Sequence, residues 1–365
     1  MLFLLLSVSD WYYSMIKAWY RKRTLYFLKP AGTSRGILHQ KPSWFLFLAD
    51  DESPEIKGIG ECSLVPGLSR ETEAAVDHKI DELCRVIQQG GMAMVPDLSA
   101  FPSLAFGLET ALLDLANGGK RELFASDFTK GKSSIRINGL IWIGSVKSML
   151  EQVEEKLNDG FRCLKFKIGS LQLEEELQLL RLVRSRFNAG DLEIRADANG
   201  AFETNAALEI LKRLAELEIH SVEQPVRPGQ WEEMARICMN SPIPIALDEE
   251  LLGRPAEEEK QSLITAIRPQ FLIIKPGLLG GFQQAETYIK LAKQENIGWW
   301  ITSALESNIG LNAIAQWTYT LSNSLAQGLG TGKLYRDNVL CPLNLKGENM
   351  FYRPSRTWDL SFIES

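Results

Sequence analysis

Short apolar segments recur through the second part of the chain at a nearly constant step. Eight of them begin 24 to 29 residues apart, near Ile137, Cys163, Leu192, Ser221, Ile245, Phe271, Gly298 and Leu325. Each is typical of a buried parallel strand, and the gaps hold segments with helical periodicity, such as 173–187. This alternation predicts a (β/α) barrel, because right-handed crossovers close the sheet on itself. An open, doubly wound sheet is the less favoured alternative, since no glycine-rich dinucleotide motif follows the first strand.

The residues before these segments follow a different pattern. Three strand-like segments predict an antiparallel meander and two helical patterns follow it, which together indicate a separate α+β domain. The strand-like segments are 17–29, 43–49 and 56–61, and the helical ones are 71–89 and 104–117. We divide the chain into an extension, an α+β domain, a barrel and a C-terminal segment that packs back on the first domain, with boundaries 1–16, 17–130, 131–332 and 333–365.

Composition and charge narrow the classes of function. Apolar residues are 45% and charged residues 24% of the chain, as in an ordinary globular protein. A net charge of −6 without a long basic run argues against a nucleic-acid partner. The five cysteines are scattered, which fits reduced thiols in the cytoplasm. The apolar stretch 1–8 is too short to span a bilayer and lacks a basic start, so we expect no membrane partner; Met15 is an alternative first residue.

Two lysines stand on the second predicted barrel strand. Because side chains alternate along a strand, Lys165 and Lys167 share one face and Phe166 takes the other. A solvated basic strand at a sheet edge is the alternative, but a closed barrel has no edge. Two lysines on an inner face are costly unless anionic groups meet them.

Three carboxylates end the next three predicted strands and could meet those lysines. Asp197, Glu223 and Asp248 follow one another along the chain at intervals of one barrel unit. Each acid alone would be a helix cap or a loop residue, but all three at adjacent strand ends would repel one another without a cation. Oxygen-only ligands with room for water favour Mg²⁺, with Mn²⁺ as a substitute.

A third lysine, Lys275, ends the sixth predicted strand, where the alternative is a lysine that reaches to the barrel rim. Lysines on both flanks of a metal suit proton abstraction beside the carboxylate of a small-molecule substrate, because the cation stabilises the enediolate. Positive charge from Lys165 and the metal would lower the pKa of Lys167 and make it the base. The histidines are poorly placed for that role; the one nearest the barrel, His220, begins a strand.

At this point the sequence resembles the enolase superfamily, in its muconate-lactonizing subgroup, over roughly residues 17–345. The residues that carry the resemblance are the Lys-x-Lys pair, the three acids and Lys275, all present in order. The resemblance implies a capping domain before a (β/α)7β barrel, and a lysine base that works with magnesium, as known for this superfamily.

Within the subgroup, four stretches resemble the o-succinylbenzoate synthase family. They are 138–142 on the first barrel strand, 302–310 at the seventh, and the capping loops 60–69 and 33–36. The resemblance implies that Lys167 abstracts the α-proton and assists loss of water, with Lys275 on the opposite face. It implies a substrate site that includes Arg195, Asn199, Ser303, Glu306, Arg35, Leu64, Pro66 and Gly67. The implied reaction is the dehydration of 2-succinyl-6-hydroxy-2,4-cyclohexadiene-1-carboxylate to o-succinylbenzoate, for menaquinone or phylloquinone synthesis.

Two departures and two alternatives accompany this interpretation. The fifth strand ends in Asp-Glu-Glu rather than Asp-Glu-Ser, so Glu250 has no assigned role. No Asp-x-Asp stands at the eighth strand, in 327–332, which disfavours a dipeptide epimerase. N-succinylamino acid racemization or muconate cycloisomerization on the same scaffold is the first alternative, because fold and catalytic set do not fix the substrate. A barrel that only binds a ligand is the second, although none of the expected catalytic or metal-binding residues is missing.

Overall fold

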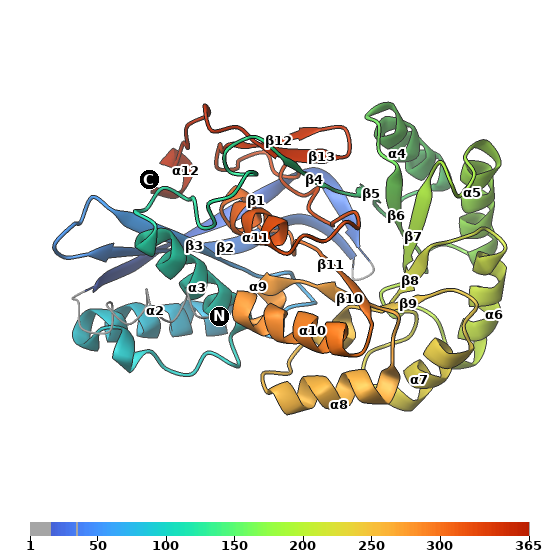
Figure 1. The fold of residues 1–365 in the computed structure, drawn as a ribbon, viewed down its shortest axis with the longest axis horizontal. Coiled ribbons are helices and arrows are strands. Elements are labelled where there is room, and N and C mark those ends of the chain that lie inside the picture. Colours follow the sequence, from blue (N-terminus) through green and yellow to red (C-terminus); the bar gives the residue numbers. More distant parts are fainter. Residues whose placement is uncertain (1–15, 34–35, 365) are drawn as a thin grey trace.

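The computed structural model describes residues 16–33 and 36–364. The predicted loop residue Arg35 and residues 1–15 of the predicted extension lie outside this range. Figure 1 shows two parts side by side, an N-terminal domain built on long antiparallel strands and a larger part in which helices surround parallel strands.

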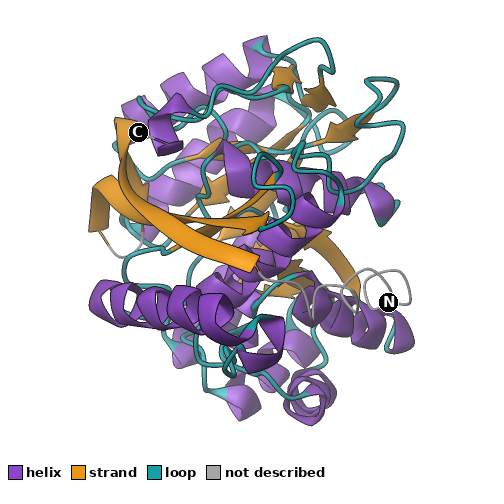
Figure 2. Ribbon diagram, turned by 90° about the vertical axis from the view of Figure 1, so that its left-hand side faces the viewer, coloured by secondary structure: helices purple, strands orange, loops and turns teal. Residues whose placement is uncertain are grey.

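The N-terminal domain is an antiparallel sheet covered by two helices. Strands β1 (Ile16–Thr33), β2 (Gly36–Asp50) and β3 (Lys57–Ser63) pair in sequence order, and Figure 2 shows the long strands with helices against them. The helices are α2 (Glu73–Gly90) and α3 (Pro102–Ala116). Helix α3 lies directly on β3, where a Cβ atom on Gly60 would stand 1.8 Å from the Gly107 carbonyl oxygen. This close approach requires glycine.

Seven parallel strands form the barrel sheet in the order β5 to β11, which confirms the predicted α/β barrel. The strands are β5 (Gly139–Ile141), β6 (Cys163–Lys167), β7 (Glu193–Asp197), β8 (Ser221–Glu223), β9 (Ile245–Leu247), β10 (Phe271–Ile274) and β11 (Gly298–Ile301). The helices are α4 (Val146–Asn158), α5 (Leu173–Arg186), α6 (Thr204–Ala215), α7 (Trp231–Asn240), α8 (Glu257–Ile267), α9 (Pro276–Leu279), α10 (Phe282–Gln294) and α11 (Asn308–Thr320). One continuous apolar core joins strands and helices.

The eighth barrel strand is reduced to two bridged residues. Gln327 pairs in parallel with Ile137, and Gly328 pairs with Thr302, so the segment closes the gap between the first and seventh strands. Its backbone accepts a hydrogen bond from Asn138 N and donates one to the Ile301 carbonyl. The (β/α)7β architecture is therefore complete, although its last strand is short.

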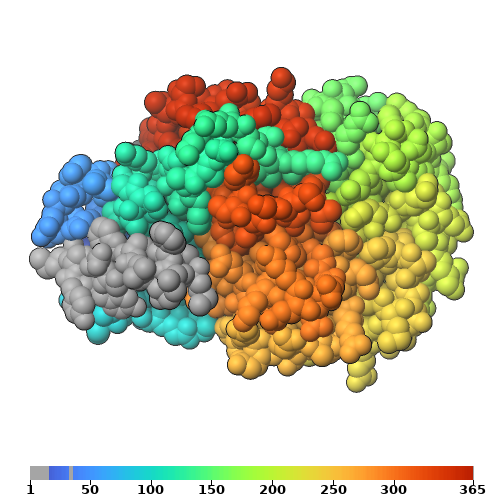
Figure 3. All heavy atoms as spheres, in the orientation of Figure 1, coloured from blue at the N-terminus to red at the C-terminus, as the bar shows by residue number. Residues whose placement is uncertain are grey.

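The C-terminal segment contacts both parts of the molecule. Strand β13 (Asn349–Tyr352) pairs on one side with β12 (Leu343–Lys346) and on the other with β4 (Ser134–Arg136), just before the barrel. In contrast, Val339 packs with apolar residues of β2 and β3, and so does Ile363 on the short α12 (Ser361–Glu364). In Figure 3 the teal residues near 120 lie against the orange-red residues near 315, where Gln316 Nε2 donates to the Arg121 carbonyl.

No helix among the described residues is both long enough and apolar enough to cross a bilayer.

Candidate active site

The alternation of β6 sends its lysines and its aromatic residue to opposite sides. Lys165 and Lys167 line a cavity at the barrel mouth, whereas Phe166 is fully buried in the apolar core under the helices. This is the arrangement that the sequence predicts, and it follows from the twofold repeat of a strand.

The three predicted acids lie at the carboxyl ends of adjacent strands. Asp197 stands level with Lys167 on one side and with Glu223 on the other, and Asp248 directly follows β9. All three are almost completely buried, with 1 to 2% of their surface exposed. Buried carboxylates require cationic or hydrogen-bonding partners.

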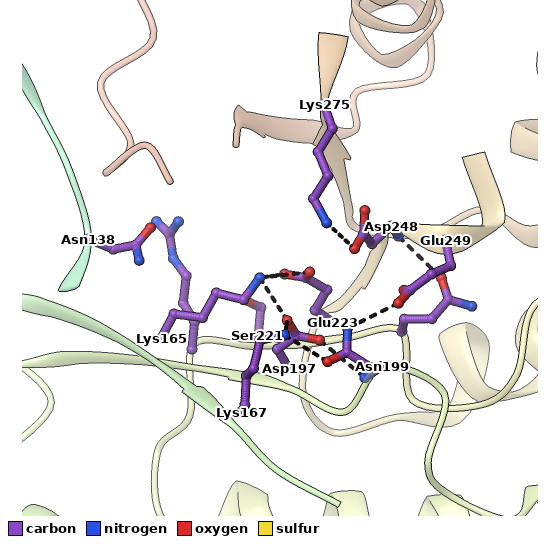
Figure 4. A network of polar contacts seen from close by, with 12 residues as sticks. Asn138, Lys165, Lys167, Asp197, Asn199, Ser221, Glu223, Asp248, Glu249 and Lys275 are labelled. Atoms are coloured by element: carbon purple, nitrogen blue, oxygen red, sulfur yellow. Dashed lines mark hydrogen bonds and ion pairs between the residues drawn. The ribbon is translucent and has the colours of Figure 1, made fainter. Parts of the chain in front are cut away.

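The lysines supply those partners, as Figure 4 shows. Lys165 Nζ lies 2.9 Å from Asp197 Oδ2 and 2.6 Å from Glu223 Oε2. Lys167 Nζ lies 3.1 Å from Asp197 Oδ2 and donates to Asn199 Oδ1 at 2.8 Å. Lys275 reaches in from the other side and forms a short ion pair with Asp248.

Burial and neighbouring charges shift the pKa values of these groups. Burial disfavours the Lys165 ammonium, but Asp197 and Glu223 outweigh it and raise the pKa of Lys165. Burial, together with the charge of Asp197, raises the pKa of Glu223 to about 8. In Asp197, burial is outweighed by Lys165 and Lys167, so its pKa is lowered. Strong mutual electrostatic coupling of this kind is characteristic of catalytic sites.

The donor set fits a hard divalent cation. All three side chains offer carboxylate oxygens, the ligands that Mg²⁺ prefers, and two of them already hold the Lys165 ammonium between them. Within 16–33 and 36–364, no three acidic, histidine or cysteine side chains are close enough together to ligate one ion in this arrangement. Binding of one Mg²⁺ by all three carboxylates would therefore require their side chains to approach one another more closely.

Both domains line the cavity, which encloses about 180 Å³. The barrel contributes the lysines, Asp197 and Asn199, and the segments after β11 and around the eighth strand. The capping domain contributes Leu38, Val65, Pro66 and Leu68. Apolar groups therefore cover one side of a space whose other side carries the charged residues.

The predicted substrate residues divide into two groups. Asn199, Ser303 and Pro66 line the cavity, whereas Leu64, Gly67, Arg195 and Glu306 are not among its lining residues. Arg195 stands two residues deeper on β7, where its guanidinium lies 4.1 Å from the Trp300 ring centroid and bonds the Ala326 carbonyl. Glu306 is fully buried and accepts a hydrogen bond from Ala304 N at 2.6 Å. Leu64 packs in the capping-domain core.

Sequence reasoning gave no role to several residues of the site. Asn138 lines the cavity, and its Oδ1 atom is buried without a hydrogen-bond partner among the described residues. Thr331 also lines it, with its hydroxyl 2.8 Å from that of Ser303. Glu249 accepts a hydrogen bond from Asn199 Nδ2 at 3.0 Å and so orients the partner of Lys167. For Asn138, the position just before the first barrel strand was the one feature of the sequence that could have indicated a place in the site.

Glu250 has a structural role that its sequence context did not reveal. Its carboxylate accepts hydrogen bonds from Gly229 N at 2.9 Å and from Trp231 Nε1 at 2.9 Å. Gln224 Nε2 and the Arg254 guanidinium also lie against it. Glu250 therefore fixes the loop after β8 to the turn after β9, beside two of the three acids.

Comparison with known proteins gives concordant results. The family model described as "Enolase C-terminal domain-like" matches residues 148–357. The o-succinylbenzoate synthase of Desulfotalea psychrophila is 47% identical, over 89% of this chain and 95% of that protein. The o-succinylbenzoate synthase of Thermosynechococcus vestitus is 26% identical, over 84% of this chain and 89% of that protein.

Solved structures agree in fold. The crystal structure of MenC from Desulfotalea psychrophila has a TM-score of 0.83 at 43% identity, and the match covers 93% of this chain and 100% of that one. The L-Ala-D/L-Glu epimerase of Bacillus subtilis has a TM-score of 0.80 at 17% identity, over 93% and 96% of the two chains, which is a likeness of fold alone. The chain therefore belongs to the enolase superfamily, and its barrel is of the enolase C-terminal domain-like family.

Proposed function

We propose that this protein is an o-succinylbenzoate synthase, a hydro-lyase that dehydrates 2-succinyl-6-hydroxy-2,4-cyclohexadiene-1-carboxylate to o-succinylbenzoate. The observation that carries the proposal is the pair of lysines on opposite walls of one cavity, with carboxylates between them. Lys167 is on β6, and Lys275 follows β10, four strands away in the sheet. The similarity to the named synthases supports this substrate over others. We place the step in menaquinone synthesis.

Proton abstraction falls to Lys167. Its Nζ atom is held by Asp197 and Asn199 and faces the cavity, so it is positioned to take the proton from the carbon beside the substrate carboxylate. The bond between the ring and the hydroxyl group then breaks, and the leaving hydroxide takes the abstracted proton back from the Lys167 ammonium and departs as water. The electron pair of the broken C–H bond completes the aromatic ring.

The remaining charged groups stabilise the negative charge that develops on the substrate carboxylate. Burial disfavours the Lys275 ammonium, but Asp248 and Glu223 outweigh it and raise the pKa of Lys275. Lys275 therefore keeps a positive charge on the wall opposite Lys167. Asp197, Glu223 and Asp248 would hold Mg²⁺, which supplies further positive charge to that carboxylate when bound. Members of the enolase superfamily depend on this metal, and we propose it as the cofactor here.

The walls of the cavity suit the rest of the substrate. Leu38, Leu68 and Trp142 offer apolar surface for the ring, and Ser303 and Thr331 offer hydroxyls near its polar groups. No lysine or acid of the capping domain within 16–33 and 36–364 lines this cavity.

N-succinylamino acid racemization is the second candidate. Its specific support is the same pair of lysines, because a racemase removes a proton on one face and returns it on the other. An ultraviolet assay with the cyclohexadiene substrate, run beside polarimetry with N-succinyl amino acids, separates the two. Rapid loss of cyclohexadiene absorbance in the presence of Mg²⁺ supports the synthase. Racemization with no dehydration would refute it.

A further inference from the structure

Glu61 of the capping domain is buried at the boundary with the barrel, and the proposed chemistry does not use it. It lies on β3, is fully buried, and accepts hydrogen bonds with both of its carboxylate oxygens. Ser43 Oγ and Ser307 N donate to Oε1, each at 2.9 Å. Ser307 Oγ donates to Oε2 at 2.6 Å, and Gly310 N donates at 3.0 Å. Four donors from two domains thus converge on one side chain.

Three of these donors belong to the first turn of α11. Ser307 is the N-cap residue of this helix, and its hydroxyl also accepts a hydrogen bond from Ile309 N at 3.2 Å. The start of a helix leaves N–H groups without partners and carries partial positive charge, so a carboxylate placed there is stabilising. The capping domain therefore provides part of the N-cap of a barrel helix. A Cβ atom on Gly310 would stand 2.8 Å from Glu306 Cβ and 3.0 Å from Glu61 Oε2, so a side chain there would crowd this contact.

The residues just before this helix form a wall of the active-site cavity. Ser303, Ala304 and Leu305 all line it. Leu305 has a φ of +62°, a left-handed conformation that costs a branched residue about 1–2 kcal/mol. Such a conformation persists only where the surroundings impose it. Tyr335 Oη, which donates to the Leu305 carbonyl at 2.6 Å, and the cap at Glu61 hold the segment from its two sides.

The strand that carries Glu61 also leads to the cavity. Two residues after Glu61, β3 ends and leads into the loop whose Val65, Pro66 and Leu68 line the capping-domain side. Val65 packs against Ala304 in a small apolar cluster that includes Leu68 and Leu305. The two cavity walls are thus in contact with each other, and Glu61 bonds the strand behind one to the helix behind the other.

We infer that Glu61 is a positioning residue, which sets the cavity wall 303–305 against the loop 64–68 by capping α11 across the domain boundary. It acts through Ser307 and does not touch the substrate. This inference rests on the proposed function for its kinetic consequence, but its structural consequence is independent of the substrate.

Glu109 provides a matched control. It lies on α3 of the same domain and caps another barrel helix, α10, by accepting hydrogen bonds from Phe282 N at 2.5 Å and Gln283 N at 3.2 Å. The chain just before α10, residues 276–281, contributes no lining residue to the cavity. Glu61→Gln and Glu109→Gln therefore each weaken one interdomain helix cap, but only the first cap directly follows residues that line the cavity.

The test compares kinetics and amide hydrogen exchange of the two variants with the wild type, in the full-length enzyme with Mg²⁺. We expect Glu61→Gln to lower kcat/KM by about 10- to 100-fold, mainly through KM, because the wall contacts the substrate but contains no reacting group. In the same variant, amide hydrogen exchange of residues 303–310 should be faster than in the wild type. Glu109→Gln should stay within about threefold of the wild type, with faster exchange confined to the start of α10.

Two outcomes would overturn the inference: wild-type kcat/KM and exchange in Glu61→Gln, or an equal kinetic loss in Glu109→Gln. A wild type without dehydratase activity would instead refute the proposed function, and the exchange data would still decide the role of Glu61. If Glu61→Gln does not fold, Ser307→Ala replaces it, with Thr72→Ala, the N-cap of α2, as its control. Ser307→Ala should then raise KM and Thr72→Ala should not; equal KM values in the two would refute the inference.

Discussion

At the scale of single residues, the active site consists of lysines and carboxylates that neutralise one another at the barrel mouth. Lys165, Lys167 and the three acids could be predicted because strand alternation and the barrel step fix which side chains meet at the mouth. Arg195 shares that face, yet its stacking on Trp300 depends on a strand distant in sequence. The contacts of Glu250 with Gly229 and Trp231 depend likewise on two loops that only the fold brings together.

Glu306 gives a prediction about pH. Burial and the charge of Glu61 raise its pKa to about 7 from the ordinary 4.5, and its Oε1 has no hydrogen-bond partner among the described residues. Because the folded-state pKa is raised, the stabilising effect of protonation is complete below pH 4.5 and is lost as the pH rises through 7. Glu306→Gln should remove this pH dependence. Its free energy of unfolding, relative to that of the wild type, should therefore rise by up to about 3 kcal/mol from pH 5 to pH 8. Urea unfolding curves at both pH values measure it, and parallel stability profiles would contradict it.

At the scale of elements, the period of apolar segments fixed the strands closely. Strands β6, β8, β9, β10 and β11 begin at the residues that the pattern indicated, and β7 begins one residue later. The first barrel strand begins at Gly139 rather than at Ile137, because Ile137 pairs with the eighth segment instead. The hairpin of β1 and β2 extends beyond the predicted segments, since antiparallel pairing continues through mixed polar and apolar residues up to its turn. Such pairing leaves little trace in apolar periodicity.

The contacts of Glu250 predict a large effect on loop stability. Glu250→Ala removes the buried acceptor of Gly229 N, Trp231 Nε1 and Gln224 Nε2. We expect the free energy of unfolding to fall by about 2–4 kcal/mol. Glu232→Ala, at an exposed position in the first turn of α7, is the control and should change it by less than about 0.5 kcal/mol. Denaturant unfolding measures both, and a similar loss in the two variants would contradict the structural role.

At the scale of the whole molecule, the active site is a product of two domains. The barrel supplies the charged groups and the capping domain supplies Leu38, Val65, Pro66 and Leu68. The division into an α+β domain and a barrel could be predicted from the change in periodicity. The contact between their walls could not, because it depends on hydrogen bonds between residues more than 200 positions apart, such as those of Glu61 with Ser307.

The ion pairs at the barrel mouth predict how the whole molecule responds to loss of metal. Lys165 and Lys275 neutralise the buried acids of the site. Treatment with a chelator should therefore abolish activity while the protein stays folded, with the melting temperature lowered by only a few degrees, since the carboxylates keep cationic partners. Circular dichroism melts with and without EDTA, followed by recovery of activity on adding Mg²⁺, measure this. Unfolding at 25 °C on chelation would contradict it.

The most direct test of the proposed chemistry is the dehydration rate of Lys167→Ala with the cyclohexadiene substrate. The variant should fold as the wild type does and bind Mg²⁺ with similar affinity by calorimetry, because Lys167 is not a metal ligand. Its kcat should fall by about 100- to 10,000-fold, since proton abstraction loses its base. Lys212→Ala, at an exposed lysine of α6, should keep wild-type activity. Substantial dehydration by a folded, metal-binding Lys167→Ala would contradict the assignment of Lys167 as the base.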